Sequence, residues 1–308
     1  PKSRELRLDG VYRTGETVAG SLKFSLRKPT KFKSIAVFFK GNVKTFYGDV
    51  DNNIMTSNSK ELLISQQKNY LSSPRIINAG VHEDSFVFNV PEDLPSSFKD
   101  RTCKITYRII AVLCKGGLFG RKEFYTEIPV CGNLESYSEQ LYYELSEIPF
   151  SLDSSKSIEL KMEMEKTFVK SGEYITFQIY LKNNTDVAVS RIEAKIIEQL
   201  SYASNRSNII TTVKKKTIEK TLVRYPGAEP NSSINFKCKV IALDELYSIQ
   251  HCKIFVREYI LNIAVILPFP HRNTSMDIPL VNKRCSNQNT RQSQLRPNQI
   301  KINVLHVN

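Results

Sequence analysis

The chain has 308 residues, of which 41% are hydrophobic and 24% are charged. This composition is globular, so it excludes a chain disordered along its whole length, and at ~100–200 residues per domain it predicts about two domains. The longest apolar runs, 109–114 and 263–269, are far shorter than the about 20 residues that a membrane-spanning helix needs. Lysine and arginine outnumber aspartate and glutamate by 44 to 31, and the net charge of +13 favours anionic partners.

Alternation of apolar and polar residues predicts β-strands along almost the whole chain. The side chains of a strand point to the two faces of a sheet in turn, so each alternating segment has one apolar face to bury. In chain order these segments are 18–26, 35–39, 86–90, 105–109, 175–181, 192–196, 234–238, 254–260 and 263–265. Many short strands with one buried face each predict an all-β fold of antiparallel sheets packed as sandwiches.

Three segments depart from the alternation. Residues 59–71 are compatible with a short helix or with a loop between strands, and residues 134–145 with a second helix or an extended linker. The glycine-rich segment 116–120 lacks the lysine and serine of a phosphate-binding loop. It therefore predicts a hairpin turn.

An internal repeat relates the two halves of the chain. Residues 11–18 (VYRTGETV) align with residues 168–175 (FVKSGEYI) at an offset of 157 residues, and the alternation continues in both copies. That period is too long for a solenoid repeat and fits a whole domain. The sequence therefore predicts two tandem β-sandwiches, at 1–148 and 149–283, followed by a basic polar tail at 284–308.

The chain contains no recognisable catalytic or metal-binding motif. None of its six cysteines forms a C-x-x-C pair or has zinc-ligand spacing with a histidine. They are interpreted as reduced, structural cysteines of a cytosolic protein. Hydrolase, zinc-protease and nucleotide-binding signatures are missing as well. The sequence predicts no enzyme activity and no cofactor.

Basic residues supply the candidate binding site. Residues 151–308 carry +9 of the net charge, and they include Lys214, Lys215 and Lys216 in the strand-like segment 211–223. One interpretation is an exposed edge strand that its lysines keep from aggregating. The other is part of a patch for phosphate or lipid headgroups. No nucleic-acid-binding motif accompanies the basic residues, so nucleic acid is not predicted as a partner.

Several motifs resemble the arrestin domains. Residues 9–20 (DGVYRTGETVAG) resemble the opening of an arrestin domain, and the most specific match to alpha-arrestins is LPSSF at 94–98 followed by ITY at 105–107. The other segments that carry the resemblance are AGVH (79–82), FVFNVP (86–91), KSGE (170–173), the strand-like segment 253–266 and DIPLV (277–281). Over about residues 6–282 the chain is similar to arrestin-domain-containing proteins of the alpha-arrestin family.

The resemblance implies two β-sandwiches joined by a short linker, and a non-enzymatic adaptor. Alpha-arrestins bind membrane receptors or transporters and recruit WW-domain HECT ubiquitin ligases through PPxY motifs, so that this cargo is ubiquitinated and internalised. The sequence has no PPxY motif, so either such a motif lies in a tail outside it or this protein does not recruit ligases in this way. The implied location is cytoplasmic, peripheral at the plasma membrane or endosomes.

The resemblance adds two arginines to the candidate site. Arg4 and Arg7 lie on or before the first strand, where the beta-arrestin subgroup uses basic residues to bind receptor phosphates. Together with Lys214, Lys215 and Lys216 they form the expected contact for an anion, a phosphate or an acidic lipid.

Two other functions fit the same sequence. An arrestin-fold coat subunit, like that of retromer, would bind a scaffold and sorting cargo. A peripheral protein could instead be held on acidic lipid by the positive charge of the second half.

Overall fold

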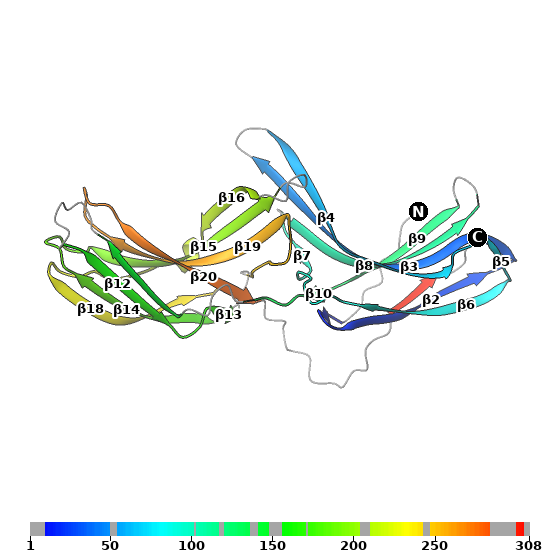
Figure 1. Cartoon of the computed structure of the whole chain (residues 1–308), viewed down its shortest axis with the longest axis horizontal. Coiled ribbons are helices and arrows are strands. Elements are labelled where there is room, and N and C mark those ends of the chain that lie inside the picture. The colour runs from blue at the N-terminus through cyan, green and yellow to red at the C-terminus, as the bar shows by residue number, and fades with distance from the viewer. Residues whose placement is uncertain are drawn as a thin grey trace.

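Two β-sandwiches lie end to end and give the molecule an elongated shape (Figure 1). The computed structural model describes residues 10–49, 54–101, 103–116, 120–135, 141–147, 156–170, 172–203, 210–242, 247–283 and 300–304. Within these ranges the chain forms strands and one short 3-10 turn, η1 (Glu219–Thr221). No described helix is long and apolar enough to cross a membrane. The all-β prediction is confirmed.

The first sandwich packs a six-stranded sheet against a three-stranded one. The larger sheet has the order β4-β3-β8-β7, with β5 paired to β3 and β9 paired to β8; the smaller has the order β21-β2-β6. A short parallel pair, β1 with β10, lies at the end nearer the second sandwich (Figure 1). The strands are β1 (Tyr12–Arg13), β2 (Thr17–Leu26), β3 (Thr30–Asp49), β4 (Ile54–Leu71), β5 (Arg75–Ile77), β6 (Gly80–Asn89), β7 (Phe98–Lys99), β8 (Cys103–Lys115), β9 (Arg121–Ile128), β10 (Val130–Cys131) and β21 (Ile300–Val304).

The second sandwich packs a four-stranded sheet against a six-stranded one. Their orders are β11-β12-β14-β18 and β13-β20-β19-β15-β16, with β17 paired to β15. The strands are β11 (Tyr142–Glu147), β12 (Ile158–Met164), β13 (Phe168–Lys170), β14 (Tyr174–Asn183), β15 (Arg191–Ala203), β16 (Ile210–Thr217), β17 (Val223–Pro226), β18 (Ser232–Ile241), β19 (Phe255–Ile266) and β20 (Thr274–Lys283).

The apolar faces predicted from alternation form the two cores. In β14, Ile175, Phe177, Ile179 and Leu181 are all buried, whereas the polar residues between them are not. The large apolar side chains of β2, at positions 18, 22, 24 and 26, are buried as well. Each sandwich has its own cluster of buried side chains between its sheets, as expected where two half-buried sheets cover each other's apolar faces.

The internal repeat has the same backbone structure in both copies. Gly15 and Gly172 have φ values of 85° and 81°, in the left-handed region that favours glycine. The amide of Gly15 donates to Val90 O, and that of Gly172 donates to Ala242 O. Each glycine separates a two- or three-residue strand in a parallel pair, β1 or β13, from a long strand of the sandwich, β2 or β14. The repeat therefore marks the same turn at the start of each sandwich.

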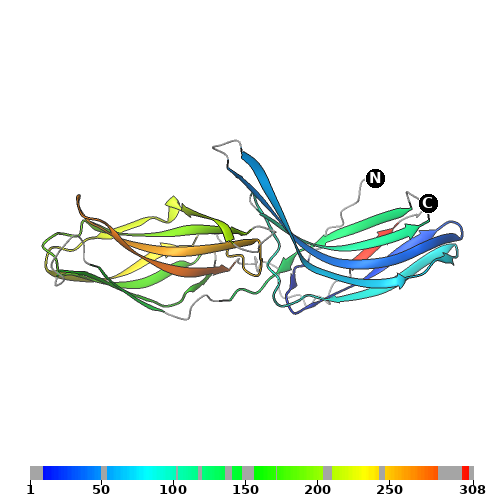
Figure 2. The same cartoon turned by 45° about the horizontal axis from the view of Figure 1, so that its top comes forward.

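Residues 59–71 are neither a helix nor a loop, contrary to the prediction. They belong to β4, which pairs with β3 in an antiparallel hairpin that extends past the rest of the sheet (Figure 2). The register between β3 and β4 shifts by one residue at this point: Gly41 pairs with Ile64, but the next residue, Asn42, pairs with Leu62. This bulge inserts Leu63 into β4 and interrupts the period of two. It leaves the exposed Leu62 and the buried Ile64 on different faces, which hid the strand from the sequence pattern.

Two strands pair outside the domain to which the sequence assigned them. Strand β11 ends at Glu147, before the predicted boundary at 148/149, but it pairs with β12 of the second sandwich. We propose a boundary before Tyr142. The predicted tail 284–308 contains β21, which pairs in parallel with β2 and buries Ile300 and Ile302 in the first sandwich. The short apolar alternation of Ile300 and Ile302 was the sequence signal for this strand, and the basic residues around it led to the prediction of a tail.

The contact between β21 and β2 depends on a glycine. A Cβ atom at Gly20 would lie 2.2 Å from Ile300 O and 2.5 Å from Phe86 Cζ. We expect Gly20→Ala to displace β21 and to lower the free energy of unfolding by about 1–3 kcal/mol, the usual cost of overpacking. Amide hydrogen exchange of residues 300–304 should accelerate. Gly116→Ala, whose nearest neighbour would be 3.9 Å away, is the control and should change neither; equal exchange in both variants would contradict the packing argument.

Candidate functional site

The predicted basic residues are only partly placed by the structure. Arg4 and Arg7 lie outside the described residues. Lys214, Lys215 and Lys216 lie on β16, an edge strand of the second sandwich. Because strand residues alternate between faces, Lys214 and Lys216 share one face of β16 and Lys215 points to the other. Lys215 forms an ion pair with Asp277 at 3.8 Å. Their role as an anion or lipid contact stays a proposal.

The LPSSF motif ties a loop to the inner end of the first sandwich. Ser97 N donates to Val130 O at 2.8 Å, and Val130 N donates to Ser97 Oγ at 2.9 Å. Ser96 Oγ accepts a hydrogen bond from Gly132 N, also at 2.9 Å. A side chain at Gly132 would place its Cβ 2.3 Å from Leu94 O. The two serines therefore hold the loop against the strand pair that begins with β1.

The tyrosine of the ITY motif completes the same arrangement. The buried Tyr107 hydroxyl donates to Pro95 O at 2.6 Å, and burial raises the pKa of the phenol, which keeps it protonated as a donor. Gly41 lies under the ring, where a Cβ would be 2.5 Å from it. The two motifs that carry the resemblance are thus parts of one packed structural unit.

The junction loop, residues 247–255, connects the two sandwiches. It belongs to the second half of the chain, yet Ile249, Cys252, Ile254 and Phe255 are buried in the cluster of the first sandwich. Tyr202 of β15 lies in that cluster too. Because burial of apolar surface is the main stabilising term in proteins, these contacts hold the domains together.

Phe98, at the end of the LPSSF motif, is the aromatic centre of this junction. Its ring makes an edge contact with Tyr247 at a centroid distance of 5.1 Å and stacks with Phe255 at 6.4 Å. Phe255 in turn contacts Tyr202 at 5.4 Å. Aromatic pairs at such distances add to the energy of area burial.

Hydrogen bonds fix the junction loop to the first sandwich and to the linker. The carboxylate of Glu61 on β4 accepts hydrogen bonds from the amides of Lys253 and Ile254 at 2.9 and 3.3 Å. Gln250 accepts from the amide of Glu135 and donates to its carbonyl, both at 2.8 Å. A side chain that pairs with both backbone groups of one residue holds that segment in one position.

Arg257 is a buried cation at the same junction. Its guanidinium donates to Glu198 Oε1 at 2.7 Å, and Asp100 of the first sandwich lies 4.0 Å away. The group also lies 5.4 Å from the ring centroids of Phe98 and Tyr247. Burial opposes its charge, but neighbouring groups, including the two carboxylates, hold the pKa of Arg257 above its ordinary value. One side chain thus contacts charged and aromatic groups of both sandwiches.

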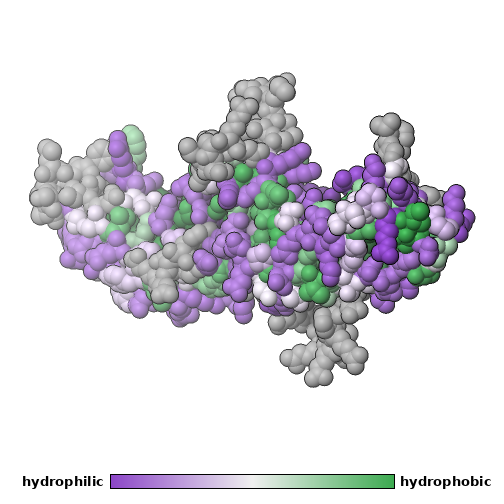
Figure 3. All heavy atoms as spheres, turned by 45° about the vertical axis from the view of Figure 1, so that its right-hand side comes forward, coloured by the Kyte–Doolittle hydropathy of each residue, from purple (hydrophilic) through white to green (hydrophobic). Residues whose placement is uncertain are grey.

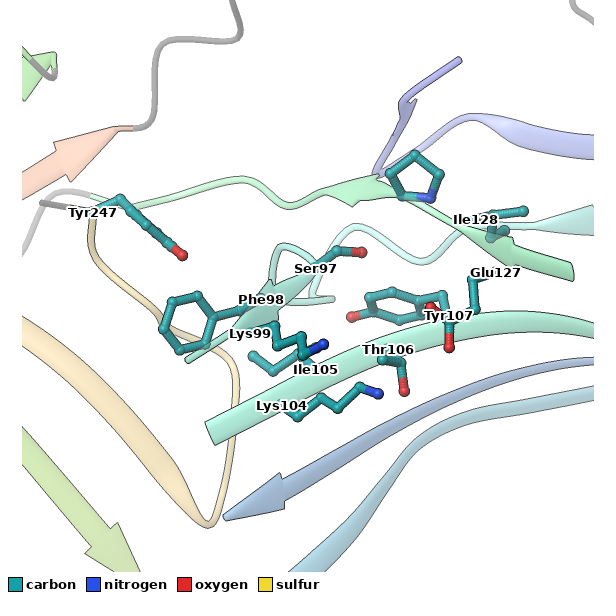
Figure 4. A pocket seen from close by; sticks show the side chains of 11 residues that line it. Ser97, Phe98, Lys99, Lys104, Ile105, Thr106, Tyr107, Glu127, Ile128 and Tyr247 are labelled. Carbon is teal, nitrogen blue, oxygen red and sulfur yellow. The ribbon is translucent and has the colours of Figure 1, made fainter. Parts of the chain in front are cut away.

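A cavity of about 500 Å³ opens beside this junction. Lys99, Lys104 and Thr106 line it from β7 and β8, Glu127 lines it from β9, and Tyr247 of the junction loop closes one end. Lys99, Lys104 and Thr106 lie close together over β8 (Figure 4). The cavity therefore offers ammonium and hydroxyl donors to a ligand.

Sequence reasoning missed the junction. The segment 254–260 was predicted as a strand from Ile254, Val256 and Ile260, but the residues of β19 that face inward are odd-numbered, including Phe255 and Tyr259. Arg257 lies on this same face. A charged residue inside an otherwise apolar alternation was the available signal, because a buried cation needs partners.

Buried thiols predict how stability depends on pH. Burial raises the pKa of Cys238 to about 12 and also raises the pKa of Cys103 and Cys252. Unfolding returns each thiol to its ordinary pKa near 9, so the stabilising difference is complete below pH 9 and is lost as the pH rises toward the folded value. We expect the free energy of unfolding to fall by about 1.4 kcal/mol per thiol for each pH unit above 9.

Urea unfolding at pH 8 and at pH 10 tests this dependence. The control is Cys238→Ala, which removes one titrating thiol and should reduce the loss between the two pH values by about 1 kcal/mol. An identical loss in both proteins would show that Cys238 does not titrate on unfolding.

Family models and known proteins agree with this architecture. Residues 5–123 match the model "Arrestin (or S-antigen), N-terminal domain", and residues 154–281 match "Arrestin (or S-antigen), C-terminal domain". Arrestin domain-containing protein 5 from Homo sapiens is 20% identical over 308 aligned residues, which cover 91% of this chain and 87% of that protein. The protein of the same name from Bos taurus is 22% identical over 217 residues, 65% of either chain.

The two family models match the two sandwiches in the order in which the structure places them. They account for the LPSSF and ITY motifs in the first sandwich and for the repeated glycine turn in both. The chain therefore belongs to the arrestin family, as an arrestin-domain-containing protein related to the alpha-arrestins.

Proposed function

We propose that the protein is a non-enzymatic adaptor that binds membrane cargo, receptors or transporters, and supports its ubiquitination, endocytosis and trafficking. The observation that carries the proposal is the pair of arrestin domains joined by a buried junction. Such a junction makes one scaffold from two domains, so that cargo and a second partner can be held at a defined separation. Family membership supports a scaffold role rather than catalysis.

Open sheet edges suit the binding of extended cargo tails. Strand β16 ends the six-stranded sheet of the second sandwich. Strand β6 ends the three-stranded sheet of the first, but its carbonyls Ser85 O and Asn89 O already accept hydrogen bonds from Tyr70 and Gln66 of β4. A strand at an edge carries backbone donors and acceptors that an added strand can pair with. Polar side chains dominate the visible surface, and apolar ones form separate small patches (Figure 3), which favours recognition through backbone pairing and charge.

Ligase recruitment needs a segment that the 308 residues do not contain. A PPxY peptide docks in an aromatic groove as a polyproline II helix, so it belongs to an extended segment rather than to a sandwich. We propose that WW-domain HECT ubiquitin ligases bind such a segment of the complete gene product. In this proposal the protein acts in the cytoplasm, at the plasma membrane or endosomes.

Capture of WW-domain ligases tests the ubiquitin part of the proposal. The purified 308-residue chain and the complete gene product are each immobilised and incubated with recombinant ligase WW domains. We expect the complete product to retain them and the 308-residue chain not to. A complete product with alanine in place of each PPxY tyrosine is the control. If the complete product retains no WW domain, recruitment of a ligase by this route is wrong.

A further inference from the structure

Four lysines form a row across the outer face of the first sandwich. Lys60 on β4 pairs with Lys44 on β3, Lys44 pairs with Lys104 on β8, and Lys104 pairs with Lys99 on β7. Directly paired residues of antiparallel strands point to the same face, with Cβ atoms about 5 Å apart. Their neighbours Val43, Ile105 and Phe98 are buried, so the lysines lie on the solvent side. We call these four residues the lysine row.

No carboxylate neutralises this row within the described part of the chain. None of the four lysines has an ion pair there. The nearest acidic residues in sequence, Glu61 and Asp100, point to the junction, where they bind Lys253 N and Arg257. Like charges directly opposite one another destabilise a sheet. A row of four therefore costs stability, and an anionic partner would offset this repulsion.

A second row on the same face, four residues along β3, shows how the fold neutralises charge elsewhere. Lys40 on β3 pairs with Arg108 on β8, and Arg108 pairs with Glu127 on β9. Arg108 Nε donates to Glu127 at 3.0 Å. The lysine row has no equivalent of Glu127. The lysines of β16 also differ from the lysine row, because Lys215 has an acidic partner in Asp277.

The dimensions of the row exclude a single phosphate as its full ligand. Four adjacent strands at about 4.8 Å spacing give a width of about 14 Å. Several negative charges must therefore be presented side by side. One end of the row, Lys99 and Lys104, lines the cavity beside Tyr247, where one phosphate group can enter between two ammonium groups.

Apolar side chains next to the row favour a membrane over a soluble polyanion. Leu62, two residues after Lys60, is 61% exposed, and Phe46, two residues after Lys44, is 41% exposed. Both lie on strands of the β3–β4 hairpin, which extends past the sheet (Figure 2). Basic residues beside exposed apolar ones are typical of surfaces that bind the interface of an anionic bilayer.

We propose that the outer face of β4, β3, β8 and β7 docks on anionic phospholipid membranes, with the lysine row on headgroup phosphates and Leu62 and Phe46 at the interface. This inference deepens the proposed peripheral location by naming the face that contacts the membrane, and it rests on that location alone. It needs neither cargo nor ligase. A failure of ligase capture leaves it standing, and a failure of docking leaves the adaptor proposal standing.

Sedimentation with vesicles tests the proposal. The purified chain is mixed with phosphatidylcholine vesicles, with or without phosphatidylserine at about a third of the lipid. A lysine near such a surface adds about 1 kcal/mol, so loss of four lysines should weaken binding by at least about 100-fold. The row variant is Lys44→Gln, Lys60→Gln, Lys99→Gln and Lys104→Gln together. The control, with equal charge change and no residue of the candidate site, is Lys170→Gln, Lys182→Gln, Lys220→Gln and Lys237→Gln on the second sandwich.

We expect the wild type and the control to bind phosphatidylserine vesicles within about tenfold of each other, and the row variant to bind them at least about 100-fold more weakly. Equal loss in both variants, or none in the row variant, would overturn the proposal. The proposal would also be overturned if the wild type did not bind the vesicles and instead retained a phosphorylated peptide through the lysine row. The urea midpoint of the row variant should equal or exceed that of the wild type, because like-charge repulsion is removed. A lower urea midpoint would contradict the claim that the four lysines repel one another without a neutralising partner.

Discussion

Replacement of Arg257 by alanine is expected to lower the free energy of unfolding by about 3–5 kcal/mol. The side chain is only 13% exposed and is the ion-pair partner of Glu198, whose own side chain is 14% exposed. Removing one member of a buried pair leaves the other charge without compensation, and the cost of that is of this size. The loss also removes a cation packed on Phe98 and Tyr247. Urea unfolding of the whole chain measures the difference.

An arginine elsewhere on the same sheet is the matched control. Arg224 pairs with Glu193 of β15, but its side chain is 62% exposed and Glu193 keeps a second partner in Arg191. Arg224→Ala should therefore cost less than about 1 kcal/mol. Equal losses for the two variants would show that Arg257 is an ordinary surface cation, and the account of the junction would be wrong.

Replacement of Phe98 by alanine is expected to cost about 3–5 kcal/mol and to separate the two sandwiches. The ring is 4% exposed and lies between Tyr247 and Phe255 of the second half of the chain. Truncation of a buried phenylalanine removes apolar burial and leaves a cavity. Small-angle X-ray scattering should show a broader distribution of distances in the variant, because Tyr247 and Phe255 lose their aromatic contact in the first sandwich.

A second aromatic residue separates the effect on the junction from a general loss of packing. Phe177 is as deeply buried, but it lies inside the core of the second sandwich. Phe177→Ala should cause a similar loss of stability without a change in the scattering of the folded protein. If Phe98→Ala leaves the scattering curve of the wild type unchanged, the ring does not hold the domains together.

The strands and the tandem arrangement could be predicted from the sequence because both depend on local patterns. Alternation in 175–181 is sufficient to place Ile175 and Phe177 in a core, whichever strands pair with it. The repeated glycine turn is local as well, since Gly15 and Gly172 need a left-handed backbone at the same place in each sandwich. Where the local period was interrupted, at the bulge beside Gly41, the strand was missed.

The junction and the lysine row could not be predicted in the same way. Arg257 meets Asp100 and Phe98 only because β19 of one sandwich begins beside β7 of the other. The lysine row requires the register of four strands, and a shift of one residue would turn a lysine to the opposite face. Lys214, Lys215 and Lys216 form a basic cluster in the sequence only because they are consecutive residues. In a sheet, however, directly paired residues of neighbouring strands share a face, whereas consecutive residues of one strand point to opposite faces.

Measurement of cargo at the cell surface tests the adaptor role most directly. In cells that express the protein, its gene is deleted, and membrane proteins at the surface and their ubiquitinated forms are quantified. Cells re-expressing the complete gene product are the control. The adaptor proposal predicts that a defined set of receptors or transporters gains surface abundance, loses ubiquitination on deletion, and returns to normal on re-expression. Unchanged surface abundance and ubiquitination across all membrane proteins would contradict it.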